Sequence, residues 1–392
     1  MKILHVIPDL MPATGGPVTA VLGMAEAEAA LGHEVTIAAT DYGLKDPPVA
    51  AGVQITVYRC TFSGWRWSPG LARALPGLVA SSDIVHIHTV WEHPAWAAAG
   101  VCRKLAKPYV LSPCGMLTGW CLSQSALKKK AYLRFAAAPV IRSASAMHFT
   151  TEEEMAASLT FGNEDRCIIV PGGLHAEVFH DLPDAGAFCR RFPELENKRI
   201  VLFLGRLHYV KQPDVVIKAF SRVSGIDDRL ALAMAGPAEP AYLAKLKSLA
   251  AELGLAGKVI FTGLLQGDAV REAFGAAELF VLPSRHENFG IAVAEAMAAG
   301  CPVVISPEVN LAGEVRAANA GIVSKSDPIS TASAMERLID NKHMRVEMGK
   351  SGRILALEKF TWFRVAVDLI AVYEDILSSR QTSRAWSKKI GS

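Results

Sequence analysis

The sequence predicts an α/β protein built from two doubly wound parallel-sheet domains, and three observations support this fold class. The chain has 392 residues, which is long for a single hydrophobic core. Short apolar runs alternate with Ala-rich helical segments, a pattern typical of βαβ units and of a parallel sheet covered on both faces. The alternation pauses at residues 171–197 and then starts again.

The first domain is expected to span residues 1–170. It starts with the apolar run KILHVIP, which predicts a buried strand, and continues with the glycine-containing TGGP. The next segment, VTAVLGMAEAEAALGH, has a helical pattern, and Gly32 stands where such a helix would end. Three further strands are predicted from EVTIAAT, DIVHIHT and PYVLSP, with a helix at residues 94–105 before the last of them.

The second domain is expected to span residues 198–360, after a connection at 171–197 that contains Pro, Gly and mixed charge. Its strands are predicted from KRIVLFLG, LALAMAG, KVIFTG, LFVLPS and PVVIS, with helices between them. Residues 361–378 have the pattern of an amphipathic helix, and a frayed tail is expected at 379–392. Two similar domains facing each other would place a cleft at the carboxyl ends of both sheets.

Composition and charge limit the classes of function. The formal net charge of +3 is nearly balanced and gives no support for a nucleic-acid partner. No run approaches the ~18 apolar residues that cross a bilayer, and the first apolar run is too short for a signal peptide, so we expect a cytoplasmic protein. The seven cysteines are scattered without C-x-x-C spacing, which favours neither a disulfide framework nor a zinc site.

Two glutamates mark the first candidate site, in the stretch SRHENFGIAVAEAMAAGCPVVIS. Glu287 lies in the loop before the predicted helix, and Glu295 lies inside it. With Gly290 at the start of the helix, the amides of residues 288–291 would be uncapped donors at the positive end of the helix dipole, which suits a phosphate or a sugar. Each carboxylate can accept from a vicinal diol. The alternative interpretation is an ordinary solvated helix edge.

Two cations mark the second candidate site, in the stretch LFLGRLHYVKQPD. Gly205 and Arg206 follow directly after a predicted buried strand, and Lys211 precedes the next helix. The planar fork of Arg and the mobile charge of Lys suit a diphosphate, although two surface cations on a loop are the simpler alternative. Both candidate sites follow strands of the same domain, where open α/β sheets bind ligands. Together they predict a site for a diphosphate-linked sugar.

With these residues, the chain resembles the retaining GT-B glycosyltransferases of family 4, also called group 1. The resemblance rests on the Gly205–Arg206–Leu207 segment with Lys211, and on the Glu-x7-Glu motif in VLPSRHENFGIAVAEAMAAGCPVVIS. TGGPVTAV resembles the N-terminal glycine loop of the family, IIVPGGLHAEVF its interdomain segment, and FTWFRVAVDLIAVYEDIL its C-terminal helix, which crosses back to the first domain. The resemblance covers nearly the whole chain.

The resemblance implies a role for each of these residues. Arg206 and Lys211 would neutralise the donor diphosphate, and Glu287 would hold the donor sugar, which makes these three the expected catalytic residues. Gly15 and Gly16 would let the backbone approach the donor phosphates closely, since glycine has no Cβ. In the second domain, the donor-binding set would be Gly205, Asn288, Phe289, Gly290, Ile291 and Glu295, the last of these at the ribose.

The expected activity is transfer of a sugar from a UDP- or GDP-sugar to a glycan or lipid-linked acceptor, with retained anomeric configuration, in surface polysaccharide biosynthesis. Fixed cations and amides would stabilise the leaving group, so neither a metal nor another cofactor is expected. The sequence contains no D-x-D pair. His86, His88 and His93 imitate metal ligands, but a polar strand end is the favoured interpretation without Cys or Asp partners. A nucleotide-sugar epimerase and a catalytically silent sugar-nucleotide-binding protein are the alternatives.

Three positions depart from the family pattern. Cys114, in SPCGMLTGW, stands where relatives commonly carry a His near the transferred sugar, so a contact to the sugar is expected to be altered or activity lost. Gly172 and His175 replace the Asn and Asp expected in the interdomain segment.

Three aromatic residues and one basic segment suggest where an acceptor binds. Trp65, Trp67 and Trp91 are candidate walls of an acceptor site. The segment SALKKKAYLRF has an apolar stripe beside basic residues, which suits either an anionic membrane surface or a solvated helix face. Its predicted membrane contacts are Lys128, Lys129, Lys130 and Arg134.

Overall fold

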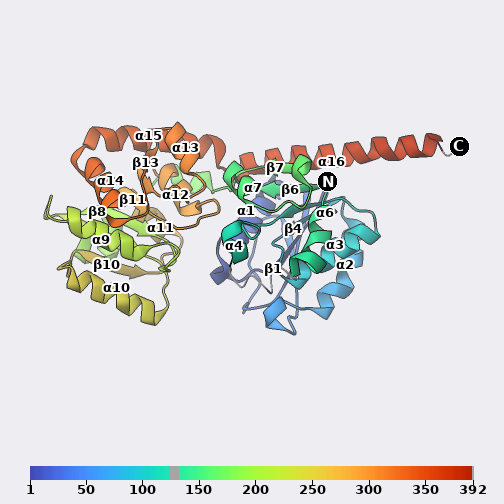
Figure 1. The fold of residues 1–392 in the computed structure, drawn as a ribbon, viewed down its shortest axis with the longest axis horizontal. Coiled ribbons are helices and arrows are strands. Elements are labelled where there is room, and N and C mark those ends of the chain that lie inside the picture. The colour runs from blue at the N-terminus through green and yellow to red at the C-terminus, as the bar shows by residue number, and fades with distance from the viewer. Residues whose placement is uncertain (124–131, 391–392) are drawn as a thin grey trace. The chain divides into compact units, whose positions relative to one another are not determined.

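A computed structural model describes residues 1–123 and 132–390 of the chain (Figure 1). The chain forms two compact units. The first consists of Met1–Gly173 together with the C-terminal residues from Trp362 on, and the second consists of Leu174–Thr361. The segment 171–197 was expected to connect the domains. Residues 171–173 belong to the first unit, and the rest of the segment contributes Phe179, Phe188 and Leu195 to the hydrophobic core of the second unit.

The first unit is built on a seven-stranded parallel sheet with the strand order β3-β2-β1-β4-β5-β6-β7. The chain moves outward from β1 through β2 to β3, then returns to the other side of β1 and continues outward from β4. The adjacent strands β4 and β5, in the middle of this sheet, are buried at every residue, which is why their sequences are largely apolar. The strands are β1 (Lys2–Asp9), β2 (Glu34–Thr40), β3 (Val53–Tyr58), β4 (Ile84–His88), β5 (Tyr109–Ser112), β6 (Ala146–Phe149) and β7 (Cys167–Ile169).

Helices lie in most of the connections between these strands. β2 leads to its neighbour β3 through a loop, and the connection from β3 to β4 returns to the other side of β1. Within the described residues, the α-helices of the first unit before the C-terminal helix are α1 (Gly16–Ala30), α2 (Pro69–Ser81), α3 (His93–Lys104), α4 (Gly119–Ser123), α6 (Ala138–Arg142) and α7 (Glu152–Ala157). The Thr151 side chain caps the last of these helices by accepting a hydrogen bond from the Glu154 amide at 3.1 Å.

The second unit repeats this arrangement with a six-stranded parallel sheet in the order β10-β9-β8-β11-β12-β13. Its strands are β8 (Arg199–Leu204), β9 (Leu230–Ala235), β10 (Val259–Gly263), β11 (Ala277–Leu282), β12 (Val303–Ile305) and β13 (Gly321–Val323). Its helices are α8 (Ala185–Arg191), α9 (Pro213–Val223), α10 (Pro240–Glu252), α11 (Asp268–Ala276), α12 (Ile291–Ala298), α13 (Ala312–Ala317), α14 (Pro328–Asp340) and α15 (Lys342–Lys359). The predicted doubly wound parallel sheets are therefore confirmed.

The C-terminal helix α16 (Trp362–Ile390) belongs to the first unit, as the sequence predicted (Figure 1). Its buried residues Trp362, Leu369 and Tyr373 pack into the core that α1 and the sheet share. Two glycines make room for the Trp362 ring: a Cβ on Gly23 would lie 2.2 Å from this ring, and a Cβ on Gly173 would lie 2.3 Å from it. The helix is thus fixed by close packing as well as by apolar burial.

Candidate functional site

The two predicted motifs of the second unit meet at one edge of its sheet. β8 and β11 are hydrogen-bonded neighbours, and the strand order reverses between them. The Gly205–Lys211 loop follows β8, and the loop that ends at Gly290 follows β11. A hydrogen bond of 2.8 Å from the Arg285 amide to the Val210 carbonyl joins the two loops directly. Such a reversal point at the carboxyl ends of parallel strands is where open α/β sheets bind ligands.

Lys211 and Glu287, one from each loop, form an ion pair. Burial, together with the neighbouring Arg206 cation, lowers the pKa of Lys211 to about 8. The backbone of Glu287 is held on its other side, since its amide donates to the Glu308 carbonyl at 3.1 Å and its carbonyl accepts from the Asn310 amide at 3.2 Å. The arrangement places a cation and a carboxylate side by side at the sheet edge, with Arg206 exposed to solvent beside them.

Helix α12 begins at this edge with its amides unprotected by a side chain. Gly290 takes the left-handed conformation at φ 89°, and none of the described side chains caps the helix there. The Phe289 side chain is buried and meets Phe360 edge-on, with ring centroids 5.3 Å apart. The Phe289 side chain therefore anchors the loop. Only the Phe289 backbone, and not its side chain, can contribute to a ligand site at this edge. The N-terminus of α12 adds roughly half a positive charge to the edge that Arg206 and Lys211 share.

Glu295 lies in the second turn of α12 and is partly buried. Burial raises the pKa of its carboxyl group to about 7. A carboxyl group with this pKa accepts hydrogen bonds fully only above neutral pH, when it is ionised. A ligand that donates two hydroxyl hydrogens to it would favour the ionised form.

The predicted glycine loop of the first unit lies at the corresponding edge of the first sheet. Gly15 has φ 78° and precedes α1, and a Cβ on either Gly15 or Gly16 would meet no atom within 4 Å. Asp9, the last residue of β1, fixes this loop by accepting from the Thr14 hydroxyl at 2.8 Å, and it also pairs with Arg66 at 2.6 Å. Asp9 and Arg66 were not among the residues predicted from the sequence, although the position of Asp9 at the end of a central strand was a usable signal.

Cys114 lies after β5 in the first unit, at φ 53°. Burial, with the nearby Glu154 carboxylate, raises the pKa of its thiol to about 12, so Cys114 is a neutral thiol at neutral pH. Glu154 is almost completely buried and holds this loop by accepting from the Gly115 amide at 2.6 Å and from the Thr150 hydroxyl at 2.8 Å. Glu154 lies in the acidic first turn of α7, so its local sequence gives no sign of this contact.

The predicted acceptor walls form an aromatic cluster in the first unit. Trp65 stacks on Trp67 with ring centroids 5.8 Å apart and donates through Nε1 to the Trp91 carbonyl at 3.0 Å. Trp96, at the rim of the cluster, is 41% exposed. His93 also packs here, 4.1 Å from Trp67, and so does not join His86 and His88.

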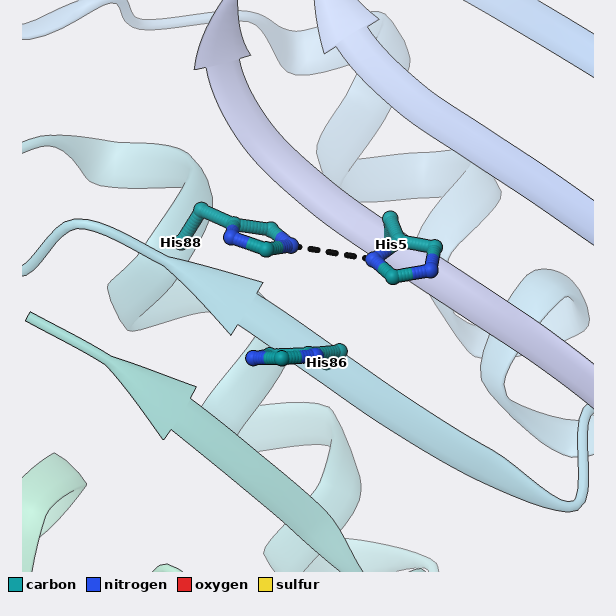
Figure 2. A group of neighbouring side chains, drawn as sticks. All are labelled: His5, His86 and His88. Carbon is teal, nitrogen blue, oxygen red and sulfur yellow. Dashed lines mark hydrogen bonds between the residues drawn. The ribbon is translucent and has the colours of Figure 1, made fainter. Parts of the chain in front are cut away.

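A second group of histidines is buried in the first sheet, where β1 and β4 carry His5, His86 and His88 side by side (Figure 2). Nitrogen atoms of the three rings lie within 4.8 Å of one another. The rings of His86 and His88 stack at 4.4 Å and 22°, so their in-plane lone pairs cannot both point at one ion. The ring nitrogens make hydrogen bonds within the protein instead: His5 to His88, and His86 to the Ser112 hydroxyl. The three side chains lie inside the core rather than at an exposed strand end.

The predicted membrane contacts Lys128, Lys129 and Lys130 lie outside the described residues. Arg134 belongs to the helical turn Leu133–Ala137. Within residues 1–123 and 132–390, no helix combines the length and the apolar composition needed to cross a membrane.

Two doubly wound parallel-sheet domains with a C-terminal helix that returns to the first domain are the GT-B architecture of glycosyltransferases. Solved structures agree with this class. The structure of Anabaena Alr3699/HepE in complex with UDP and glucose matches 96% of this chain and 100% of that chain, with a TM-score of 0.79 and 17% identity. Sucrose-phosphate synthase from Thermosynechococcus elongatus matches 97% of this chain and 100% of its own, with a TM-score of 0.77 and 21% identity.

Family models give the more specific assignment. Residues 188–354 match "Glycosyl transferases group 1", and residues 15–173 match "Glycosyl transferase 4-like domain". The chain therefore belongs to the group 1, or family 4, glycosyltransferases.

Individual relatives agree with this family. The D-inositol 3-phosphate glycosyltransferase of Acidothermus cellulolyticus is 32% identical over 245 residues, 59% of this chain and 53% of the relative. That of Stackebrandtia nassauensis is 30% identical over 60% of this chain and 54% of the relative. The chain thus spans about half the length of these two relatives. An uncharacterized glycosyltransferase of Methanocaldococcus jannaschii, MJ1607, is 27% identical over 95% of this chain and 98% of its own.

Proposed function

We propose that this protein is a retaining, metal-independent hexosyltransferase that moves a sugar from a nucleoside-diphosphate donor to a glycan or lipid-linked acceptor. The convergence of Arg206, Lys211, Glu287 and the N-terminus of α12 at the β8–β11 edge carries the proposal. This edge combines two cations with uncapped amides for a diphosphate and with a carboxylate for sugar hydroxyls. HepE, a structural neighbour, is described in complex with UDP-glucose, which supports a UDP-sugar as the first donor to test.

The proposed chemistry needs charge stabilisation more than a protein nucleophile. As the bond between the sugar and the diphosphate breaks, negative charge grows on the leaving phosphate, where Arg206, Lys211 and the α12 amides would stabilise it. A phosphate oxygen of the leaving group takes the acceptor proton while the acceptor oxygen attacks the same face of the sugar. One glycosidic bond replaces the sugar–phosphate bond, and the nucleoside diphosphate leaves with the proton.

Product analysis tests the mechanism directly. With an α-linked nucleotide sugar, NMR should show an α-linked product, and the rate should be unchanged by EDTA. A β linkage would contradict retention, and loss of activity that Mg²⁺ restores would contradict metal independence. We place the reaction in surface polysaccharide biosynthesis, in the cytoplasm or on the inner face of the membrane. Binding of the full chain to anionic liposomes at low salt would support the membrane contact.

Cys114 favours one alternative, a protein that binds nucleotide sugars without transferring them. Its thiol is neutral at neutral pH, and the family resemblance implies a His near the transferred sugar at this position. Calorimetric titration with UDP-sugars, followed by an assay for released nucleotide, separates the two functions, because a silent protein binds the donor without releasing UDP. Comparing the rate of donor hydrolysis in Cys114→His with that of the unmodified protein then shows whether this position matters. Equal rates would reduce it to a packing residue.

A further inference from the structure

Two neighbouring strands of the second unit end in glycine at the edge where the donor is proposed to bind. Gly205 follows β8 and Gly236 follows β9, and both have positive φ angles, 154° and 142°. The two strands pair in parallel, and the last pair in their register is Leu204 with Ala235. The two glycines therefore come directly after the last paired residues of adjacent strands.

Backbone hydrogen bonds hold the chain on both sides of Arg206 against the loop after β9. The Gly205 amide donates to the Ala235 carbonyl at 2.9 Å, and the Leu207 amide donates to the Pro237 carbonyl at 2.8 Å. The Leu207 side chain is buried, which anchors the second contact in the core. Arg206 lies between these two bonds, and it is exposed at the edge of the sheet.

Gly236 lies between the two carbonyl acceptors and faces the Gly205–Arg206 peptide. A Cβ at position 236 would lie 2.0 Å from the Gly205 carbonyl oxygen, 2.7 Å from its carbonyl carbon and 3.4 Å from the Arg206 nitrogen. Because a Cβ does not approach other heavy atoms closer than about 3 Å, a side chain here would displace the peptide by about 1 Å. The obstacle is backbone, which cannot turn aside as a flexible side chain does.

The far end of the same loop is held by other contacts. The Arg285 amide donates to the Val210 carbonyl at 2.8 Å, which joins this end to the loop after β11. The Lys211 amide donates to the His208 carbonyl, also at 2.8 Å. Lys211 and Arg206 are thus positioned by different contacts, and those of Arg206 involve the loop that contains Gly236.

We infer that Gly236 is a positioning residue for donor binding. Because it has no side chain, the Gly205–Arg206 peptide can rest on the end of β9, and this contact sets where the Arg206 guanidinium meets the diphosphate. The inference rests on the proposed function, in which Arg206 is one of two cations at the diphosphate. The planar fork of Arg binds phosphate oxygens with specific geometry, so a displacement of about 1 Å weakens the contact.

Gly236→Ala tests the inference in the full chain, with UDP as the probe and calorimetric titration as the assay. UDP should bind at least about tenfold more weakly to this variant than to the unmodified protein. Gly254→Ala is the matched control in the same unit, because Gly254 has φ 71° and a Cβ there would meet nothing within 4 Å. This control adds backbone strain without a clash, and it lies before β10, at the opposite edge of the sheet. It should keep the UDP affinity, and an equal loss in both variants would overturn the inference.

A double-mutant cycle with Arg206→Ala separates the positioning of this cation from a general loss of structure. Arg206→Ala alone should weaken UDP binding. Adding Gly236→Ala to it should weaken binding by less than about twofold more, because the cation that Gly236 positions is already absent. If the two losses multiply instead, Gly236 acts independently of Arg206 and the inference is overturned.

The same cycle distinguishes failure of the inference from failure of the proposed function. If Arg206→Ala weakens UDP binding and Gly236→Ala does not, the inference is wrong and the proposed donor site stands. If Arg206→Ala binds UDP as tightly as the unmodified protein, or the unmodified protein binds no UDP, both are refuted.

Hydrogen exchange at single amides gives an answer that does not depend on a nucleotide. In Gly236→Ala, the amides of Gly205 and Leu207 should exchange at least about tenfold faster than in the unmodified protein, because their bonds to the loop after β9 are disturbed. The Arg285 amide, which bonds the far end of the loop, should keep its protection, and Gly254→Ala should leave all three unchanged. Unchanged exchange at Gly205 and Leu207 would overturn the inference, as would faster exchange throughout residues 174–361.

Discussion

Donor use should follow a bell-shaped pH profile set by two residues of the second unit. Glu295 must be ionised to accept from a diol, and burial raises its pKa to about 7. Lys211 must be charged to stabilise a diphosphate, and burial lowers its pKa to about 8. Glu295 therefore sets the acidic limb of the profile, because its carboxyl group gains its charge as pH rises. Lys211 sets the alkaline limb, because its ammonium group loses its charge as pH rises further.

The width of the bell follows from these two values. With one group titrating near pH 7 and the other near pH 8, about 60% of the protein carries both charges at pH ~7.5. At pH 6 and at pH 9 that fraction is about 9%, a loss of roughly sixfold on either side. The effect is large enough to measure because the two pKa values lie so close together.

The assay is kcat/KM for the donor between pH 5.5 and 9.5, which reports on the free enzyme. Glu295→Gln should lower donor use and remove the acidic limb, while Lys211→Arg should keep the charge and remove the alkaline limb below pH 9.5. Far-UV circular dichroism at each pH controls for unfolding. A flat profile between pH 6 and 9, or limbs that both variants leave unchanged, would refute the assignment.

Two pairs of substitutions test the packing and the backbone conformation of the first unit. Gly23→Ala should lower the free energy of unfolding by about 1–3 kcal/mol, because its Cβ would lie 2.2 Å from the Trp362 ring, whereas Gly100→Ala in α3, with nothing within 4 Å, should raise it by about 0.5–1 kcal/mol. Equal effects in urea unfolding would contradict the close contact with α16. Gly15→Ala should cost about 1–3 kcal/mol through backbone strain at φ 78°, while the neighbouring Gly16→Ala should cost little, and a thermal melt distinguishes them.

Much of the donor edge was predictable because its information is local. The glycine, the cations and the glutamates sit in two short motifs, each directly after an apolar strand, and a parallel sheet brings the ends of neighbouring strands together. The sequence does not state that β8 and β11 are neighbours. The strand–helix alternation predicted only that both motifs follow strands of one domain, and the structure shows these two strands to be neighbours.

Contacts between distant parts of the chain were not predictable. Tyr373 and Glu28 are 345 positions apart, and the amphipathic pattern of α16 predicts a buried face without showing which polar group lies opposite. Glu154 has the local sequence of a solvated first helical turn, yet the loop of Cys114 and Gly115 covers it. In both cases burial comes from a segment far away in sequence, which hydrophobic periodicity cannot reveal.

Calorimetric titration of UDP and GDP into the unmodified protein and into Lys211→Met tests the central claim most directly. Either UDP or GDP should bind to the unmodified protein. Lys211→Met should weaken this binding by about 100-fold or more, since the substitution removes the buried Lys211 cation at the diphosphate. Glu287→Gln, matched in size, should keep the affinity for the nucleotide and weaken only the nucleotide sugar. Unchanged nucleotide affinity in Lys211→Met would contradict the proposed diphosphate site.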